Sequence, residues 1–189
     1  MQIRAAACLL FGLMLTAAAD AAGYPQTIEV FRGAGESEAF FKHCYAYAVF
    51  PTVGAGAIGI GGAYGKGRVY LHDQWVGNVS MGQVSLGVQL GGKAYSQIIF
   101  FEDARSLEQF ESGKFEFGAE TSAIAITSGA NAQVATNGVS RGMSQGQHNA
   151  VTEGTYQAGI VVFVVAKGGL MASASLAGQR FNFEPLAAQ

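Results

Sequence analysis

Residues 51–67 have the spacing of a nucleotide-binding loop. In PTVGAGAIGIGGAYGKG, Gly54, Gly56 and Gly59 form GxGxxG, and Asp73 follows at about the distance of the acid in a dinucleotide-binding fold. That motif needs a helix directly after the glycines, with its N-terminus pointing at a pyrophosphate. Here more glycines follow, and each lowers helix stability by about 1 kcal/mol relative to alanine. The sequence therefore predicts strand glycines, placed where a backbone, an aromatic ring or a ligand approaches closely.

The residue types that catalysis and metal binding require are present but scattered. His43, His72 and His148 stand in three different local contexts, and the GxSxG nucleophile elbow is absent from the sequence. The acidic residues between positions 102 and 120 lack the alternating pattern of an EF-hand loop and have basic neighbours as partners. We expect no enzymatic activity, no metal and no cofactor, and a hydrolase site assembled from separate loops is the least favoured alternative.

Composition restricts the class of protein. Half of the 189 residues are hydrophobic, 13% are charged, and the formal net charge is −2. Such a chain is neither disordered nor a nucleic-acid binder that works by counterion release. The length suffices for one domain with its own core. We expect a single domain over residues 20–189 and no nucleic-acid partner.

The first 19 residues resemble a secretory signal peptide. Arg4 supplies a positive charge, residues 5–15 form an apolar stretch, and residues 17–19 form an AxA cleavage site. The apolar stretch is shorter than the roughly 20 residues that span a bilayer. We expect cleavage near Ala19 and a periplasmic or secreted location. Cleavage leaves Cys44 as a single, buried cysteine, so the mature chain is expected to have no internal disulfide.

Short helices are predicted at two places in the chain. The segment TIEVFRGAGESEAFFKHC, residues 27–44, shows two short helical patterns separated by glycines, with Ser37 as the cap of the second. Asp103 is predicted to cap a further helix that stops near Gly113.

Most of the remaining sequence follows the period-two pattern of strands. Residues 45–50 predict a buried strand that ends at Pro51, and residues 68–80 predict a hairpin that turns at positions 72–74. Residues 83–90 predict a half-buried strand with Val84 on its apolar face. Further strands are expected within residues 94–102, 114–129, 155–169 and 170–183, with a polar loop or weakly paired edge over residues 129–152. These patterns predict an α+β, β-rich domain in which an antiparallel sheet forms a sandwich or a partly closed barrel with a few short helices.

Three separated blocks occur in an order that resembles the SYLF domain family. They are FPTVGAGAIGIGGAYGKG, VSLGVQLGGKAYSQIIFF and VFVVAKGGLMASASLAGQRF, and the resemblance extends from about Thr27 to Phe183. In eukaryotes this family comprises lipid-binding and actin-regulating proteins, and it has many exported bacterial members. The resemblance implies a phospholipid-binding domain, with phosphoinositides as the ligands attributed to eukaryotic members.

Two departures from the family limit what the resemblance implies. Gly169 is an extra residue within the KG-L-M-A element of the third block. The basic amphipathic N-terminal helix of some members is replaced here by a segment of mixed charge that glycines interrupt. An exported protein also has no evident actin partner. We therefore expect lipid association without phosphoinositide specificity or actin regulation.

The resemblance favours a lipid-binding role for basic and aromatic residues that could otherwise form a solvated rim or pack in the core. The candidate lipid-binding residues are Tyr64, Lys66, Arg68, Trp75, Lys93 and Lys167. Tyr95 is expected to be a further exposed aromatic residue at the interface. We expect acyl chains to lie on a glycine-lined sheet surface with lysines near the headgroup, at the periplasmic face of an envelope membrane.

The alternative comes from a different class of function. It is a structural or protein-interaction module of the cell envelope, which binds another envelope protein through a sheet edge or through the tract over residues 129–152.

Overall fold

The computed structural model describes residues 23–58, 60–86, 91–117, 124–126, 155–168, 176 and 178–187. The predicted signal peptide and the polar tract over residues 129–152 lie outside these ranges. The strands are β1 (Ala46–Ile58), β2 (Ile60–Leu71), β3 (Gln74–Leu86), β4 (Gly91–Phe101), β5 (Ile124–Ile126), β6 (Ile160–Gly168) and β7 (Gln179–Pro185). The helices are a first helix over residues 23–32, α2 (Gly35–His43) and α3 (Ala104–Glu111).

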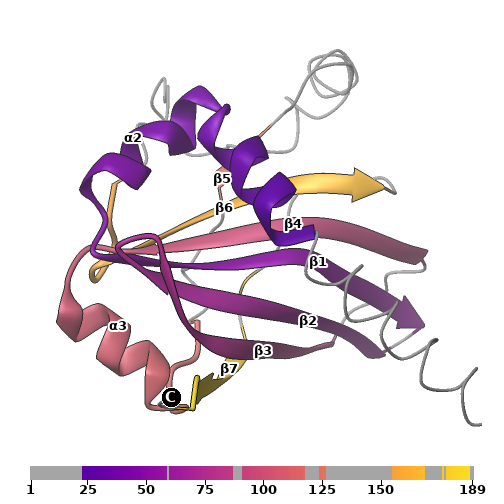
Figure 1. The fold of residues 1–189 in the computed structure, drawn as a ribbon. Helices are drawn as coiled ribbons and strands as arrows, with labels where there is room; N and C mark the ends of the chain where they lie inside the picture. The colour runs from indigo at the N-terminus through magenta and orange to yellow at the C-terminus, as the bar shows by residue number, and fades with distance from the viewer. Residues whose placement is uncertain are drawn as a thin grey trace, which may run out of the picture.

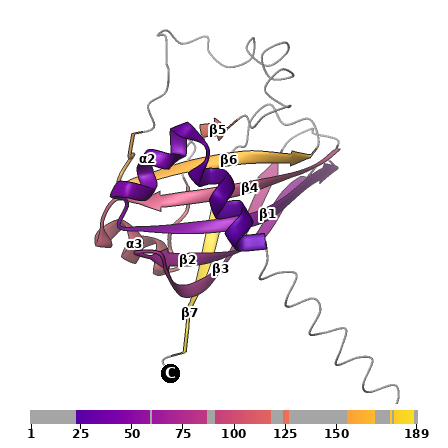
Figure 2. The same ribbon diagram turned by 45° about the horizontal axis from the view of Figure 1, so that its top comes forward.

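One seven-stranded sheet organises the domain. Its order is β5-β6-β4-β1-β2-β3-β7, and all neighbours are antiparallel except β5 and β6, which are parallel. The first helix and α2 lie on one face of the sheet and α3 on the other (Figures 1 and 2). The α+β, β-rich class and the short helices are confirmed. No helix in the described ranges has the length and apolar character needed to cross a membrane.

The two faces of the sheet bury two separate apolar layers, because successive side chains of a strand point to opposite faces. The α3-side core contains Phe50, Met81, Ile99, Phe101, Phe110 and Phe181, among others. The α2-side core includes Phe31, Tyr47, Val49, Ile98, Phe100 and Phe163. Strands β1, β4 and β6 therefore contribute to both cores and form the apolar centre of the domain.

A buried polar contact shows how strongly the sheet curls around the α3-side core. Gln97 Nε2 on β4 donates a hydrogen bond to Gln179 Oε1 on β7 at 3.1 Å, and Gln179 Nε2 donates to the hydroxyl of Tyr95 at 3.3 Å. Strands β1, β2 and β3 separate β4 from β7 in the sheet. The sheet must therefore bend until β7 approaches β4. This curvature fits the predicted partly closed barrel, although the edge strands β5 and β7 do not pair with each other. Tyr95 is 2% exposed, so its predicted exposure is wrong because this residue faces the interior of the curl.

Pro51 does not end the strand, contrary to the prediction. β1 continues through it, and its register shifts at this point against both neighbours, β2 and β4. Proline has no N–H for the ladder, and a bulge lets the strand continue past the missing donor. The carbonyl of Pro51 accepts a hydrogen bond from the Ser96 hydroxyl at 2.7 Å. Beyond this bulge, Thr52 and Gly54 take the face on which Tyr47 and Val49 lie before it.

The separate strand predicted at residues 83–90 is also wrong. β3 runs without interruption from the hairpin turn to Leu86, and residues 87–90 lie outside the described ranges. Val84, which was expected on the apolar buried face, is 75% exposed. Its strand partner is Gly62, so this part of the sheet presents an apolar side chain to solvent.

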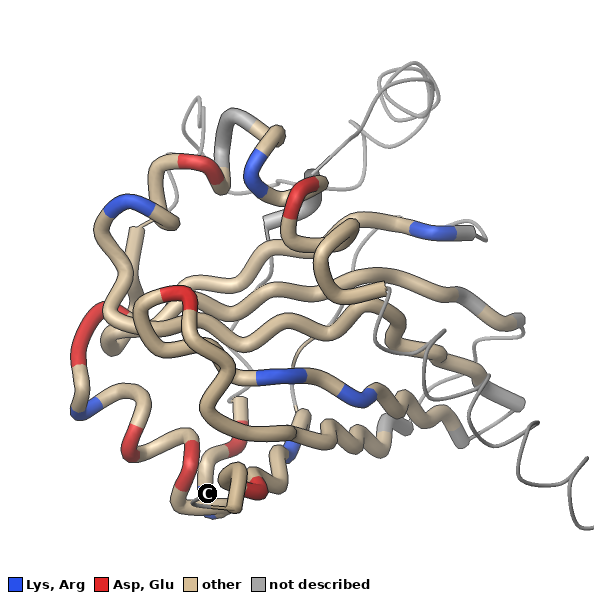
Figure 3. Tube along the Cα trace, viewed as in Figure 1, with Lys and Arg blue, Asp and Glu red and all other residues tan. Residues whose placement is uncertain are grey.

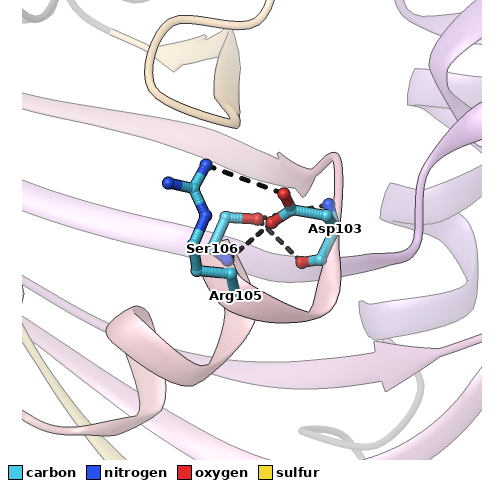
Figure 4. A network of polar contacts seen from close by, with 3 residues as sticks. All are labelled: Asp103, Arg105 and Ser106. Carbon is cyan, nitrogen blue, oxygen red and sulfur yellow. Dashed lines mark hydrogen bonds and ion pairs between the residues drawn. The ribbon is translucent and has the colours of Figure 1, made fainter.

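The two predicted helix caps have different outcomes. Asp103 caps α3 as predicted: its carboxylate accepts from the backbone N–H of Ser106 at 2.8 Å, with Arg105 3.7 Å away (Figure 4). This N–H lowers the pKa of Asp103 below its ordinary value. Ser37 is not the cap of α2, because Ala34 is the N-cap residue and makes no side-chain cap. The Ser37 hydroxyl instead donates to the Phe31 carbonyl, which ties α2 to the end of the first helix.

We predict that the Gln97–Gln179 pair stabilises the curl as a unit. Gln97→Leu and Gln179→Leu should each reduce the free energy of unfolding by about 1–3 kcal/mol, because each removes the hydrogen bonds between the two buried amides. The double variant should lose less than the sum of the two single losses, since both changes remove the same two hydrogen bonds. Urea unfolding of the four proteins measures this coupling, and strictly additive losses would contradict it.

Candidate lipid-binding face

The strand glycines fall into two groups with different physical causes. Gly65 and Gly67 face the α3-side core, where an added Cβ would lie 2.8 Å from Val53 Cγ2 and 2.7 Å from the Phe50 ring. Packing therefore requires glycine at both positions. At Gly54 and Gly82 an added Cβ would meet nothing within 4 Å, and neither residue has the left-handed backbone that favours glycine. Packing and backbone geometry leave these two glycines unexplained, whereas close approach of a ligand would explain them.

An exposed tyrosine stands at the centre of this open part of the sheet. Strand pairing places Gly54 on one side of Tyr64 and Gly82 on the other. The next row of paired residues carries Gly56, Gly62 and Val84. Tyr64 is 57% exposed, so its ring rises from a surface that has few other side chains. We call this surface the glycine face, and it consists of Gly54, Gly56, Gly62, Tyr64, Gly82, Val84 and Gly92.

Two of the predicted lysines are each next to Thr52, at the border of the glycine face. Lys66 is the strand partner of Thr52, and Lys167 Nζ donates to Thr52 Oγ1 at 3.2 Å. Neither lysine forms an ion pair with another residue in the described ranges. Figure 3 shows the corresponding basic positions on β2 and at the end of β6. Arg180 is also exposed beside this face, but its guanidinium is paired with Glu116 at 2.7 Å.

Arg68 and Trp75 form a second group, next to the lysines. The guanidinium carbon of Arg68 lies 4.0 Å from the centroid of the Trp75 ring and 4.2 Å from that of the Tyr24 ring. Trp75 Nε1 donates to the Gly77 carbonyl at 3.0 Å. These contacts join the first helix to β2 and β3. Sequence reasoning missed Tyr24, because no local spacing relates a residue of the first helix to an arginine on a strand.

The remaining predicted residue is Lys93. It lies in β4 opposite Ala55, and its side chain is outside the part of the chain that the structure describes. The structure thus brings Tyr64, Lys66 and Lys167 together around one surface and places Arg68 and Trp75 beside it.

The β2–β3 turn confirms that Asp73 belongs to a hairpin and not to a dinucleotide site. His72 and Asp73 both have positive φ, 47° and 64°, as a two-residue hairpin turn requires. The Asp73 carboxylate accepts hydrogen bonds from Arg32 at 2.7 Å and from the Tyr47 hydroxyl at 2.8 Å. These partners hold the turn against the first helix. Within the described ranges, no three His, Cys, Asp or Glu side chains lie close enough together to hold a metal ion.

We predict that the two groups of glycines respond differently to alanine. Gly67→Ala should reduce the free energy of unfolding by about 1–3 kcal/mol, because the added methyl overpacks against Phe50. Gly54→Ala should change it by less than about 1 kcal/mol in either direction, because space is open there and alanine lowers the entropy of the unfolded chain. Urea unfolding measures both changes. Equal losses for the two variants would show that Gly54 is also needed for packing.

Cys44 is partly buried and not fully buried as expected, and we predict that it behaves as a thiol of low reactivity. Burial, and then the nearby charge of Asp73, raise its pKa from 9.0 to about 11. Iodoacetamide should therefore label Cys44 slowly at pH 8 in the folded chain from residue 20 onward and rapidly in urea. Because the folded pKa is raised, the thiol's contribution to stability is present below pH 9 and is lost as pH rises toward 11. A Cys44→Ala variant should lack this component, and equal labelling of folded and unfolded protein would contradict the assignment.

A comparison with known families finds a match over part of the chain. The family model Ysc84, described as "Las17-binding protein actin regulator", matches residues 82–185. This span is more than half of the chain and runs from β3 to the end of β7. It contains the second and third blocks that resemble the SYLF domain and leaves out the first, at residues 50–67. No curated protein matches the chain.

Proposed function

The chain belongs to the Ysc84 (SYLF) family, which is linked in general to lipid binding, actin regulation and protein interaction, and on this basis we propose that it is an exported, non-enzymatic protein that binds phospholipid or the envelope membrane. The family is of the binding type and is not a known enzyme family. The observation that carries the proposal is the glycine face, with its exposed Tyr64 and Val84 beside two lysines that lack acidic partners among the described residues.

The glycine face suits an apolar chain for a simple reason. Its central residues lie on β1, β2 and β3, which are interior strands whose backbone groups are already paired on both sides. An acyl chain laid on this surface therefore displaces water without leaving backbone donors or acceptors unsatisfied. Each buried methylene contributes about 0.8 kcal/mol. Glycine at positions 54 and 82 lets the chain contact the backbone directly, while Tyr64 and Val84 supply apolar edges.

The lysines give the surface a polarity that matches a phospholipid. Lys66 and Lys167 each lie next to Thr52, whereas Gly56, Gly62 and Val84 lie two rows of paired residues away, beyond Tyr64. A basic side chain near an anionic membrane contributes about 1 kcal/mol, and salt weakens this attraction. We assign the lysine end to the headgroup and the glycine end to the acyl chains.

Export and location remain part of the proposal. They are supported by the signal-peptide pattern of residues 1–19, by the expected single domain over residues 20–189 and by the resemblance to exported bacterial members of the family. At the periplasmic face of an envelope membrane, phospholipid is an available ligand and actin is not.

A vesicle flotation assay tests the proposal with the mature chain. Wild-type protein should float with phosphatidylcholine vesicles that contain phosphatidylglycerol. Gly54→Gln and Gly82→Gln should abolish flotation, because each places a polar side chain where the acyl chain would lie, and both should keep their fold because the space there is open. Ala39→Gln adds the same side chain at an exposed position of α2 and should float like the wild type.

The outcomes separate three interpretations. Flotation of both glycine variants would move lipid contact away from the glycine face. Failure of the wild type to float with neutral or anionic vesicles would contradict lipid binding and would favour the alternative, a protein-interaction module of the envelope.

A further inference from the structure

Arg68 is the one basic residue in the described ranges whose guanidinium lies against two aromatic rings. The rings come from different elements, Tyr24 from the first helix and Trp75 from β3. A guanidinium is planar and attracts aromatic faces, and such contacts fix its orientation. Arginine ordinarily has many rotamers, so the two rings remove conformational freedom before any ligand arrives.

The hydrogen-bond donors of Arg68 remain available. No hydrogen bond or ion pair joins its guanidinium to another residue that the structure describes. The buried side-chain polar atoms that lack a partner in these ranges are Arg32 Nε and Tyr156 Oη. No nitrogen of Arg68 is among them, and Arg68 is only partly buried. An oriented fork of N–H donors without an acceptor is the arrangement that binds two oxygens of one anion.

A second cation adjoins this fork. Lys66 lies two residues before Arg68 on β2, so both side chains leave the same face of the strand. Lys66 also has no acidic partner in the described ranges. Arg180 provides the contrast, because Glu116 already occupies its guanidinium.

We propose that Tyr24 and Trp75 are positioning residues that hold Arg68 as a preoriented fork for two oxygens of a phosphate group. Lys66 supplies further positive charge beside the fork. This inference deepens the proposed lipid binding, and the choice of a phospholipid as the source of the phosphate rests on that proposal. In a phospholipid, the headgroup phosphate occupies the fork while the acyl chains extend toward Tyr64. Generic attraction between basic residues and an anionic surface would need no such orientation.

The single tryptophan of the chain makes the fork directly observable. Trp75 is the only tryptophan among the 189 residues, and it touches Arg68, so its fluorescence should change when an anion binds there. The probes are inorganic phosphate, with chloride at equal ionic strength as reference, and phosphatidylcholine vesicles with and without phosphatidylglycerol. We expect a saturable change with phosphate and with the anionic vesicles.

Charge-preserving variants separate orientation from charge. Arg68→Lys keeps the charge but loses the fork, and Tyr24→Leu keeps every cation but removes one ring. Each should weaken phosphate and vesicle binding about tenfold, which corresponds to the loss of a bidentate, oriented contact. Tyr24→Phe retains the ring and should bind like the wild type, as should Arg180→Lys. Thermal unfolding verifies that the variants fold. If Tyr24→Leu does not fold, the affinity of Arg68→Lys alone tests the fork.

The results distinguish failure of the fork from failure of lipid binding. Wild-type affinity in both Arg68→Lys and Tyr24→Leu would overturn the fork while leaving lipid binding intact. Phosphate binding that depends on Arg68, without any vesicle binding, would support the fork and contradict the lipid as its source. Absence of any Trp75 response and of any vesicle binding would overturn both.

Discussion

The bulge at Pro51 decides which residues of β1 face which layer of the domain. Before it, Tyr47 and Val49 point toward the first helix and α2. With strict alternation, Val53 would follow them onto that face and Gly54 would point into the α3-side core. The extra residue reverses this assignment, so Val53 is buried in the core and Gly54 is exposed. The open glycine face therefore depends on one proline that the strand ladder cannot accommodate without a shift.

Glycine serves two purposes in the sheet: on the α3-side it allows close packing of the core, and on the opposite side it leaves the glycine face open. Gly65 and Gly67 allow the backbone of β2 to approach the Phe50 and Val53 side chains, and this close approach accompanies the curl that brings β7 toward β4. At Gly54 and Gly82 an added Cβ would instead meet nothing within 4 Å. The helices cover only part of the opposite face, and beyond them the sheet carries Tyr64 and Val84 in solvent.

Local sequence patterns predicted the elements better than their continuity and exposure. The β-rich class, the paired N-terminal helices, the Asp103 cap and the hairpin turn all follow from spacing and are confirmed. The continuation of β1 through Pro51 could not be predicted, because a bulge depends on neighbouring strands. Alternation also cannot tell which face of a strand is buried, which explains the errors at Val84 and Tyr95. The placement of Lys66 and Lys167 on either side of Thr52, and the contact of Arg68 with Tyr24, join distant parts of the chain and could be seen only in the fold.

Lipid contact through the glycine face is tested most directly by mass spectrometry of organic extracts from protein that has been purified from the periplasm without detergent. We expect a phospholipid in stoichiometric amount with the wild-type protein and a clear loss of it from the Gly82→Gln variant. A lipid-free wild-type protein, or equal amounts of lipid in both proteins, would contradict lipid binding at this surface.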